Sequence, residues 1–163
     1  MPSHFSVRLA KEHHVFSAAH FITFNGNVCE RLHGHNYRVN VEVFGPLDEN
    51  HYVIDFIALR DELSKITDAL DHRMLLPTTH PLIRVTTSGQ EVEAVFTPDG
   101  RRWVFPLDDC RLLPVPNTTA ELLAQYIGGQ LLDAIQARTG TRPARLRALV
   151  DENHGQWGVC ELT

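Results

Sequence analysis

Apolar and polar side chains alternate in several stretches of the chain, and this alternation predicts β-strands. Phe5–Leu9 alternates, and we expect that strand to run on towards His20. The stretch Phe21–Leu32 contains Asn25-Gly26-Asn27 and is typical of a loop. Three further strands are expected at His33–Phe44, Leu146–Val150 and Trp157–Leu162.

Two other stretches space their apolar residues three and four apart, which predicts amphipathic helices. The first follows Asp55, a suitable N-cap, and its apolar positions are Phe56, Leu59, Leu63, Ile66 and Leu70. The second begins at Thr118 or Thr119, where Thr118-x-x-Glu121 matches a capping box, and ends before Gly140.

Between the helices, residues Leu82–Leu113 contain three short strand-like runs separated by Ser88-Gly89 and Asp99-Gly100. Such dipeptides are hairpin signals, so we expect an inserted β-meander that need not touch the chemistry. The order ββα–(β-meander)–αββ predicts an α+β fold in one domain over residues 1–163. Its antiparallel four-stranded sheet would carry both helices on one face.

Composition narrows the functional classes. With 163 residues and 43% hydrophobic content the chain can bury one core, and its net charge of −5 argues against nonspecific nucleic-acid binding. No apolar run approaches the roughly 18–20 residues of a membrane span. Three widely spaced cysteines suggest reduced thiols, and the first four residues lack a secretory pattern. We therefore expect a cytoplasmic protein without membrane or nucleic-acid partners.

The most informative pattern is His33-Gly34-His35, because residues two apart on a strand project to the same side. A third histidine, His20, ends the small-residue run Phe16-Ser17-Ala18-Ala19. Three imidazoles without an obvious fourth ligand are the inventory of a catalytic zinc site, and the all-imidazole set favours zinc over softer or redox metals. The other histidines are expected to be solvated or hydrogen-bonded side chains.

Other candidates have two interpretations each. Cys29 is better placed as a reactive thiol than as a fourth ligand. Asp71-His72 follows the first helix, either as an ordinary helix-terminal histidine or as an acid–base pair. Glu152 has the parity of the inward-facing residues Leu146–Val150, so it either meets a ligand or cation, or turns to solvent.

Several motifs, in order along the chain, resemble the 6-pyruvoyl tetrahydropterin synthase family, which includes the bacterial 6-carboxytetrahydropterin synthases of queuosine biosynthesis. The motifs are Phe16–His20, Cys29–Tyr37, Val53–Phe56, Leu70–His72, Thr119–Glu121 and Val150–Glu152. The resemblance implies the tunnelling fold, in which three subunits close their sheets into a barrel and two trimers stack into a hexamer. It also implies active sites at subunit interfaces and 7,8-dihydroneopterin triphosphate as substrate.

The resemblance implies a role for each matching residue. The implied zinc ligands are His20, His33 and His35, and the implied catalytic residues are Cys29, Asp71 and His72. Glu152 would grip the guanidine-like edge of the pterin, while Thr119 and Glu121 would line the pterin pocket. The residues that hold the triphosphate are left open, with Arg31, Arg38 and Arg73 as candidates.

The product depends on two neighbouring residues. The gap between Cys29 and His33 resembles the 6-carboxytetrahydropterin branch, so we expect a zinc-dependent lyase that forms this product, acetaldehyde and triphosphate. Glu30, however, sits where some relatives replace the cysteine and release a hydroxymethylpterin. The same family resemblance also allows a pyruvoyl product, or a catalytically silent binding module. The retained catalytic set disfavours the silent module.

Overall fold

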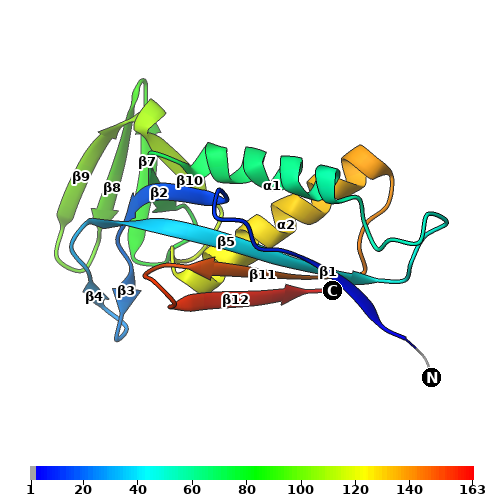
Figure 1. Cartoon of the computed structure of the whole chain (residues 1–163). Coiled ribbons are helices and arrows are strands. Elements are labelled where there is room, and N and C mark those ends of the chain that lie inside the picture. Colours follow the sequence, from blue (N-terminus) through cyan, green and yellow to red (C-terminus); the bar gives the residue numbers. More distant parts are fainter. Residues whose placement is uncertain (1–2) are drawn as a thin grey trace.

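Two long helices lie on one face of a mixed β-sheet in the computed structural model, which describes residues 3–163 (Figure 1). The helices are α1 (Phe56–Leu70) and α2 (Ala120–Thr139). The strands of the main sheet are β1 (Phe5–Leu9), β2 (Val15–His20), β5 (His33–Gly45), β6 (Arg73–Pro77), β10 (Cys110–Leu113), β11 (Arg145–Asp151) and β12 (Trp157–Leu162). The fold class is therefore α+β, with the helices on one side as expected.

The main sheet has seven strands rather than the four expected, in the order β10-β6-β2-β5-β11-β12 with β1 also paired to β5. Nor is it purely antiparallel, because β6 runs parallel to β2 and β10 runs parallel to β6. Helix α1 carries the chain back to β6, beside β2. The chain returns from the inserted segment as β10, so the end of the expected insert belongs to the main sheet.

The single strand expected from Phe5 towards His20 is two strands, β1 and β2, that pair with successive parts of β5. The interruption lies at residues 10–14, where Val39 donates its N–H to the His14 carbonyl. His14 is fully buried there, and neither ring nitrogen finds a hydrogen-bond partner among the described residues. His14 is therefore neither the solvated nor the hydrogen-bonded side chain that the sequence predicted, and burial lowers its pKa to about 4.

The segment between β6 and β10 contains a three-stranded antiparallel sheet. Its strands are β7 (Ile83–Ser88), β8 (Glu91–Phe96) and β9 (Arg101–Pro106), followed by the 3₁₀ turn η1 (Leu107–Asp109). The inner face of this meander packs on a second apolar cluster, formed with residues of the main sheet and of the short hairpin β3 (Thr23–Phe24) and β4 (Val28–Cys29). The meander thereby covers the end of the sheet where β2 stops (Figure 1).

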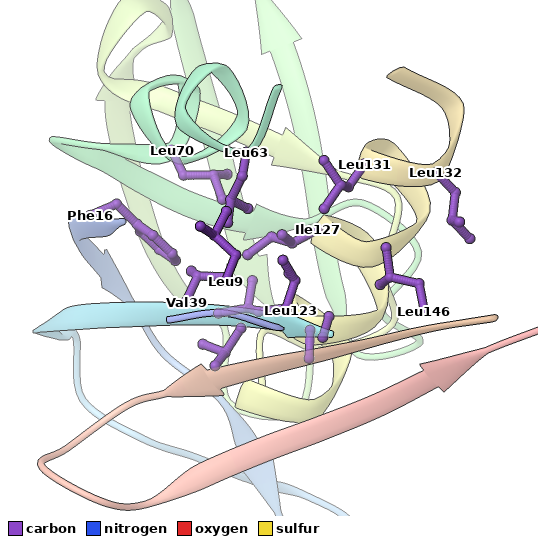
Figure 2. Close-up of a cluster of buried hydrophobic side chains, with 14 of the residues drawn as sticks. Leu9, Phe16, Val39, Leu63, Leu70, Leu123, Ile127, Leu131, Leu132 and Leu146 are labelled. Carbon is purple, nitrogen blue, oxygen red and sulfur yellow. The ribbon is translucent and has the colours of Figure 1, made fainter. Parts of the chain in front are cut away.

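Both helices begin where the sequence predicts, but Thr119 rather than Thr118 is the N-cap of α2, so the capping box expected from Thr118 and Glu121 does not form. Asp55 caps α1 by accepting the Ile57 N–H at 2.8 Å, and Thr119 caps α2 by accepting the Leu122 N–H at 3.5 Å. Their apolar faces meet the sheet in the larger core, drawn in Figure 2 with Phe16, Val39, Leu63, Leu123 and Ile127 among the labelled residues. Within residues 3–163, neither helix is long and apolar enough to cross a membrane.

Strand β12 passes very close to the start of α2 at Gly158. A Cβ atom at this position would lie 2.3 Å from the carbonyl carbon of Ala120 and 2.5 Å from the Glu121 nitrogen. Both atoms belong to the backbone and cannot move aside cheaply. A glycine is therefore required for β12, and with it the β11–β12 hairpin, to lie against the first turn of α2.

Candidate metal centre and neighbouring acid–base groups

Three histidines converge at one end of β2 and β5. His20 ends β2 and is the direct cross-strand partner of His33, while His35 follows two residues later on β5. The three ring centroids are 4.8, 5.3 and 4.9 Å apart. The period-2 geometry of a strand brings His33 and His35 to one side, as the sequence predicted.

Hydrogen bonds on the far side of two rings fix which nitrogen faces the cluster. The Nδ1 atom of His20 lies 2.9 Å from the Thr118 carbonyl oxygen, and that of His33 lies 2.8 Å from the Arg31 carbonyl oxygen. A carbonyl can only accept, so each Nδ1 donates a proton, and in the neutral ring Nε2 is then the nitrogen with the free lone pair. Metal-bound histidines are oriented by such outer bonds.

A carboxylate joins the histidines, although the sequence offered no obvious fourth ligand. Glu152 Oε1 lies 3.0 Å from His35 Nε2 and 3.3 Å from His20 Nε2. One ligand atom from each of these four residues lies within 4.8 Å of the others. The contact between His35 Nε2 and Glu152 Oε1 lacks hydrogen-bond geometry, so this buried nitrogen has no hydrogen-bond partner among the described residues. Burial lowers the pKa of the His35 imidazole. A neutral nitrogen left without a proton donor suits a bound cation, so the residues fit a divalent metal.

Tyr37 contacts the ring of His20 and was not singled out from the sequence. Its hydroxyl oxygen lies 3.2 Å from His20 Nε2 and 3.3 Å from Nδ1, and the side chain is fully buried. Burial raises the pKa of the phenol far above its usual range, so Tyr37 stays neutral. Its position two residues after His35 on the same strand face was a usable signal.

Cys29 and Glu30 point in different directions. The Cys29 side chain is only 6% exposed and belongs to the apolar cluster under the meander, and burial raises the pKa of its thiol. The Glu30 carboxylate instead approaches the histidines, with Oε2 3.8 Å from His33 Nε2. Both residues line an open cavity of about 440 Å³ together with Arg31 and His33.

Asp71 and His72 form a hydrogen-bonded pair just after α1. Asp71 Oδ1 accepts the Ser17 N–H at 2.7 Å, and this bond is the main cause that lowers the pKa of the carboxyl group. Its Oδ2 lies 2.8 Å from His72 Nδ1. The His72 ring is 84% exposed, and its backbone adopts φ +54°. The carboxylate thus orients an imidazole whose Nε2 faces outward.

The acid–base pair and the thiol do not share a cavity within one chain. His72 lines a cavity of about 610 Å³ together with His35, Arg73 and Phe105. Cys29 and Glu30 line the other cavity, on the side of His33. The histidine cluster therefore lies between two hollows, each of which holds part of the expected catalytic set.

Thr119 and Glu121 lie at the start of α2, and the preceding residue, Thr118, contacts the histidine cluster. The Thr118 carbonyl holds His20, while the Thr119 hydroxyl is engaged in capping the helix. Glu121 is exposed. Neither Thr119 nor Glu121 lines the two cavities that contain the histidines.

The inserted meander lies against residues of the candidate site. Arg101, at the start of β9, donates from Nη2 to the Cys29 carbonyl at 3.2 Å. Trp103 stacks on Phe21 with ring centroids 4.4 Å apart, and Phe105 lines the cavity that His72 lines. The meander forms part of the wall around the candidate site, which local hairpin signals could not reveal.

Comparison with known proteins gives a consistent result. The family model described as 6-pyruvoyl tetrahydropterin synthase matches residues 8–162. A Methanocaldococcus jannaschii protein, provisionally named a 6-carboxy-5,6,7,8-tetrahydropterin synthase, is 32% identical over 89% of this chain and 87% of its own length. A Bacillus subtilis 6-carboxy-5,6,7,8-tetrahydropterin synthase is 36% identical over 46% of this chain and 59% of its own length.

Among solved structures, the 6-pyruvoyl tetrahydropterin synthase of Plasmodium falciparum is similar over 99% of both chains, with a TM-score of 0.89 and 29% identity. The Plasmodium vivax enzyme has been solved as two catalytic residue mutants, in which alanine or cysteine replaces a glutamate. Each of these covers 99% of both chains, with a TM-score of 0.88 and 26% identity.

Proposed function

Because this chain belongs to the 6-pyruvoyl tetrahydropterin synthase family, we propose that it is a zinc-dependent lyase acting on 7,8-dihydroneopterin triphosphate. With one water consumed per turnover, the proposed products are 6-carboxy-5,6,7,8-tetrahydropterin, acetaldehyde and triphosphate, which suits a role in making queuosine-type 7-deazapurines. The names of the archaeal and bacterial relatives support this outcome. The observation on which the proposal rests is the convergence of His20, His33 and His35 with Nε2 presented inward.

In the proposed reaction each group has one task. A zinc ion held by the three histidines would polarise substrate oxygens and acidify the adjacent carbon-bound proton. Cys29 removes that proton as the thiolate, and His72, oriented by Asp71, returns a proton to the developing oxygen or to the leaving group. Glu152 accepts hydrogen bonds from the two-donor edge of the pterin. Thr119 and Glu121 belong to the pterin pocket in this scheme.

Contacts made by the candidate arginines favour one of them for the triphosphate. Arg38 is bound to Asp151, and Arg73 donates to the Asp108 carbonyl. Among residues 3–163, Arg31 makes no ion pair, is exposed and lines the cavity beside His33. We therefore assign Arg31 the leading role in binding the triphosphate.

A second outcome has its own support. Glu30, rather than Cys29, approaches His33, and a catalytic glutamate occurs in the Plasmodium vivax enzyme. A carboxylate base at this position would favour release of a hydroxymethylpterin from the same substrate. A pyruvoyl product is the third outcome.

Mass analysis of the products separates these outcomes. The zinc-loaded protein is incubated with 7,8-dihydroneopterin triphosphate, and the pterin, any two-carbon fragment and triphosphate are identified. We expect 6-carboxytetrahydropterin with one acetaldehyde per turnover. A hydroxymethylpterin or pyruvoyl product would assign the chain to another branch of the family. Recovery of unchanged substrate would indicate a catalytically silent binding module.

We propose that the active protein is a symmetric homo-oligomer, a hexamer of two trimers. Strands β10 and β12 end the sheet, and closure into a ring would remove their open edges. Within one chain, His72 and Cys29 line different cavities. A neighbouring copy could bring its exposed His72 to the cavity that Cys29 lines. Light scattering at micromolar concentration is expected to report six chains, and a monomer would contradict the assembly.

Glu152→Gln is expected to weaken pterin binding sharply while altering the rate of proton removal less. The amide keeps the size of the side chain but loses the charge that strengthens two N–H donors from the pterin. The measurement is the KM and kcat of the zinc-loaded variant. Zinc content must be determined in parallel, because Oε1 also lies beside His20 and His35. Unchanged KM at full zinc content would contradict the assignment.

A further inference from the structure

The turn between β11 and β12 presents Glu152 to the histidines. The turn is closed by the Glu152 N–H, which donates to the Gln156 carbonyl at 3.0 Å. Within it His154 has φ +48° and Gly155 has φ +105°. Such left-handed conformations are uncommon for a residue with a side chain, so this turn needs support from its surroundings.

That support comes from Asp151, the last residue of β11, whose side chain is only 1% exposed. Its Oδ1 accepts the Gly155 N–H at 2.8 Å and the Gln156 N–H at 3.1 Å. Hydrogen bonds from the turn and from Arg38 hold the pKa of this carboxyl below its usual range despite burial. A buried carboxylate whose one oxygen accepts hydrogen bonds from two consecutive turn amides fixes the path of the backbone.

The other carboxylate oxygen ties the turn to the strand of the metal centre. Asp151 Oδ2 accepts from Arg38 Nε at 3.1 Å and also from Nη2. Arg38 lies on β5, three residues after His35, and its guanidinium sits 5.7 Å from the ring centroid of Trp157 on β12. One bonded unit thus joins the strand that carries His33 and His35 to the hairpin that carries Glu152.

We propose that Asp151 is the positioning residue that holds Glu152 in register with the histidine cluster, and that Arg38 serves the same unit rather than the substrate's phosphates. The proposal rests on the proposed role of Glu152 in pterin binding. Asp151 acts on the ligand only through the turn, because its own oxygens are fully engaged by Gly155, Gln156 and Arg38.

The test compares four variants of the zinc-loaded protein. Asp151→Ala removes the support, and Asp151→Asn retains an oxygen that can accept both turn amides. Glu152→Gln is the reference for loss of the ligand contact. Glu161→Gln is the matched control, because it removes a carboxylate that pairs with Arg147 on the outer face of the same hairpin. Two quantities are measured: the Kd for neopterin by fluorescence, and hydrogen exchange of the Gly155 and Gln156 amides.

Asp151→Ala is expected to weaken neopterin binding about tenfold, the usual scale for a residue that orients a ligand-binding group, and to accelerate exchange of both amides. Asp151→Asn should recover only part of the affinity and of the protection, because its remaining oxygen can accept the turn amides while its NH2 group cannot accept from Arg38. Glu161→Gln should match the unaltered protein. Wild-type affinity in Asp151→Ala, with Glu152→Gln impaired, would overturn the inference. Wild-type affinity in Glu152→Gln would instead refute the proposed role of Glu152.

If Asp151→Ala does not fold, Arg38→Met takes its place, because the Arg38 side chain is 47% exposed and its removal leaves the apolar core intact. Loss of neopterin affinity together with faster exchange at Gly155 and Gln156 would support the positioning unit. Wild-type values for both quantities would overturn it.

Discussion

The His33→Ala/His35→Ala variant is expected to purify without zinc and to form no product, whereas the unaltered chain should hold one zinc per subunit. Two of three imidazole ligands are removed, and the remaining His20 with Glu152 cannot complete a tetrahedral set. Elemental analysis after dialysis against a weak chelator measures the bound metal directly. The result does not depend on which pterin product the enzyme forms.

The control is His4→Ala/His13→Ala, which removes the same number of imidazoles from exposed positions outside the cluster. It should retain full zinc content, which would exclude a general effect of losing histidines. Circular dichroism shows whether the His33→Ala/His35→Ala chain is folded. A folded double variant that still binds stoichiometric zinc would refute the assigned ligands.

The second large effect concerns Cys29 and Glu30. Cys29→Ala is expected to nearly abolish formation of 6-carboxytetrahydropterin, and Glu30→Gln is expected to cost little, because a thiolate is the stronger base and nucleophile of the two. The structure makes this a sharp test, since the Cys29 side chain is buried while Glu30 lies nearer to His33. Steady-state rates of both variants, at matched zinc content, provide the comparison.

The pH dependence of the reaction distinguishes the same two bases. Burial raises the pKa of the Cys29 thiol, so its thiolate fraction, and with it the rate, should increase as pH rises from neutral into the alkaline range. A rate that stays level across that range would argue against a thiolate base. A level profile together with a large loss in Glu30→Gln would make Glu30 the base and a hydroxymethylpterin the product.

The parts of the site that could be predicted from the sequence depend on local geometry. Period 2 along one strand places His33 and His35 together. Glu152 joins them as a candidate ligand, although it lies in the turn just after β11 rather than on the strand. Asp55 and Thr119 cap their helices as expected, because capping is decided by residues within one turn.

The features that sequence patterns missed depend on contacts between distant segments. The parallel pairing of β6 and β10 has no local signature, because short buried apolar runs fit several structures. The break between β1 and β2 is visible only once Val39 is seen to bond the His14 carbonyl. Asp151 looks like an ordinary strand-end residue until the turn amides that it accepts are identified.

The meander shows how an insertion can enter a site without supplying an obvious motif. Arg101 is held between Phe96 and Trp103, with its guanidinium carbon 5.6 and 5.8 Å from their ring centroids, and reaches the Cys29 carbonyl. The meander contributes part of the wall of the candidate site and the hydrogen bond from Arg101, and neither can be recognised from the spacing of residues in the sequence. Only the folded chain relates residues 101–105 to the segment around Cys29.

The placement of the chain's two tryptophans gives the protein built-in optical reporters. Trp103 stacks on Phe21 in the meander wall, and Trp157 lies against Arg38 beside the hairpin of Glu152. The two indoles therefore lie on different segments of the chain, one in the meander wall and one beside the hairpin of Glu152. Their emission should respond to pterin binding without any attached label, and replacing either one with phenylalanine would separate events at the wall from events at the hairpin.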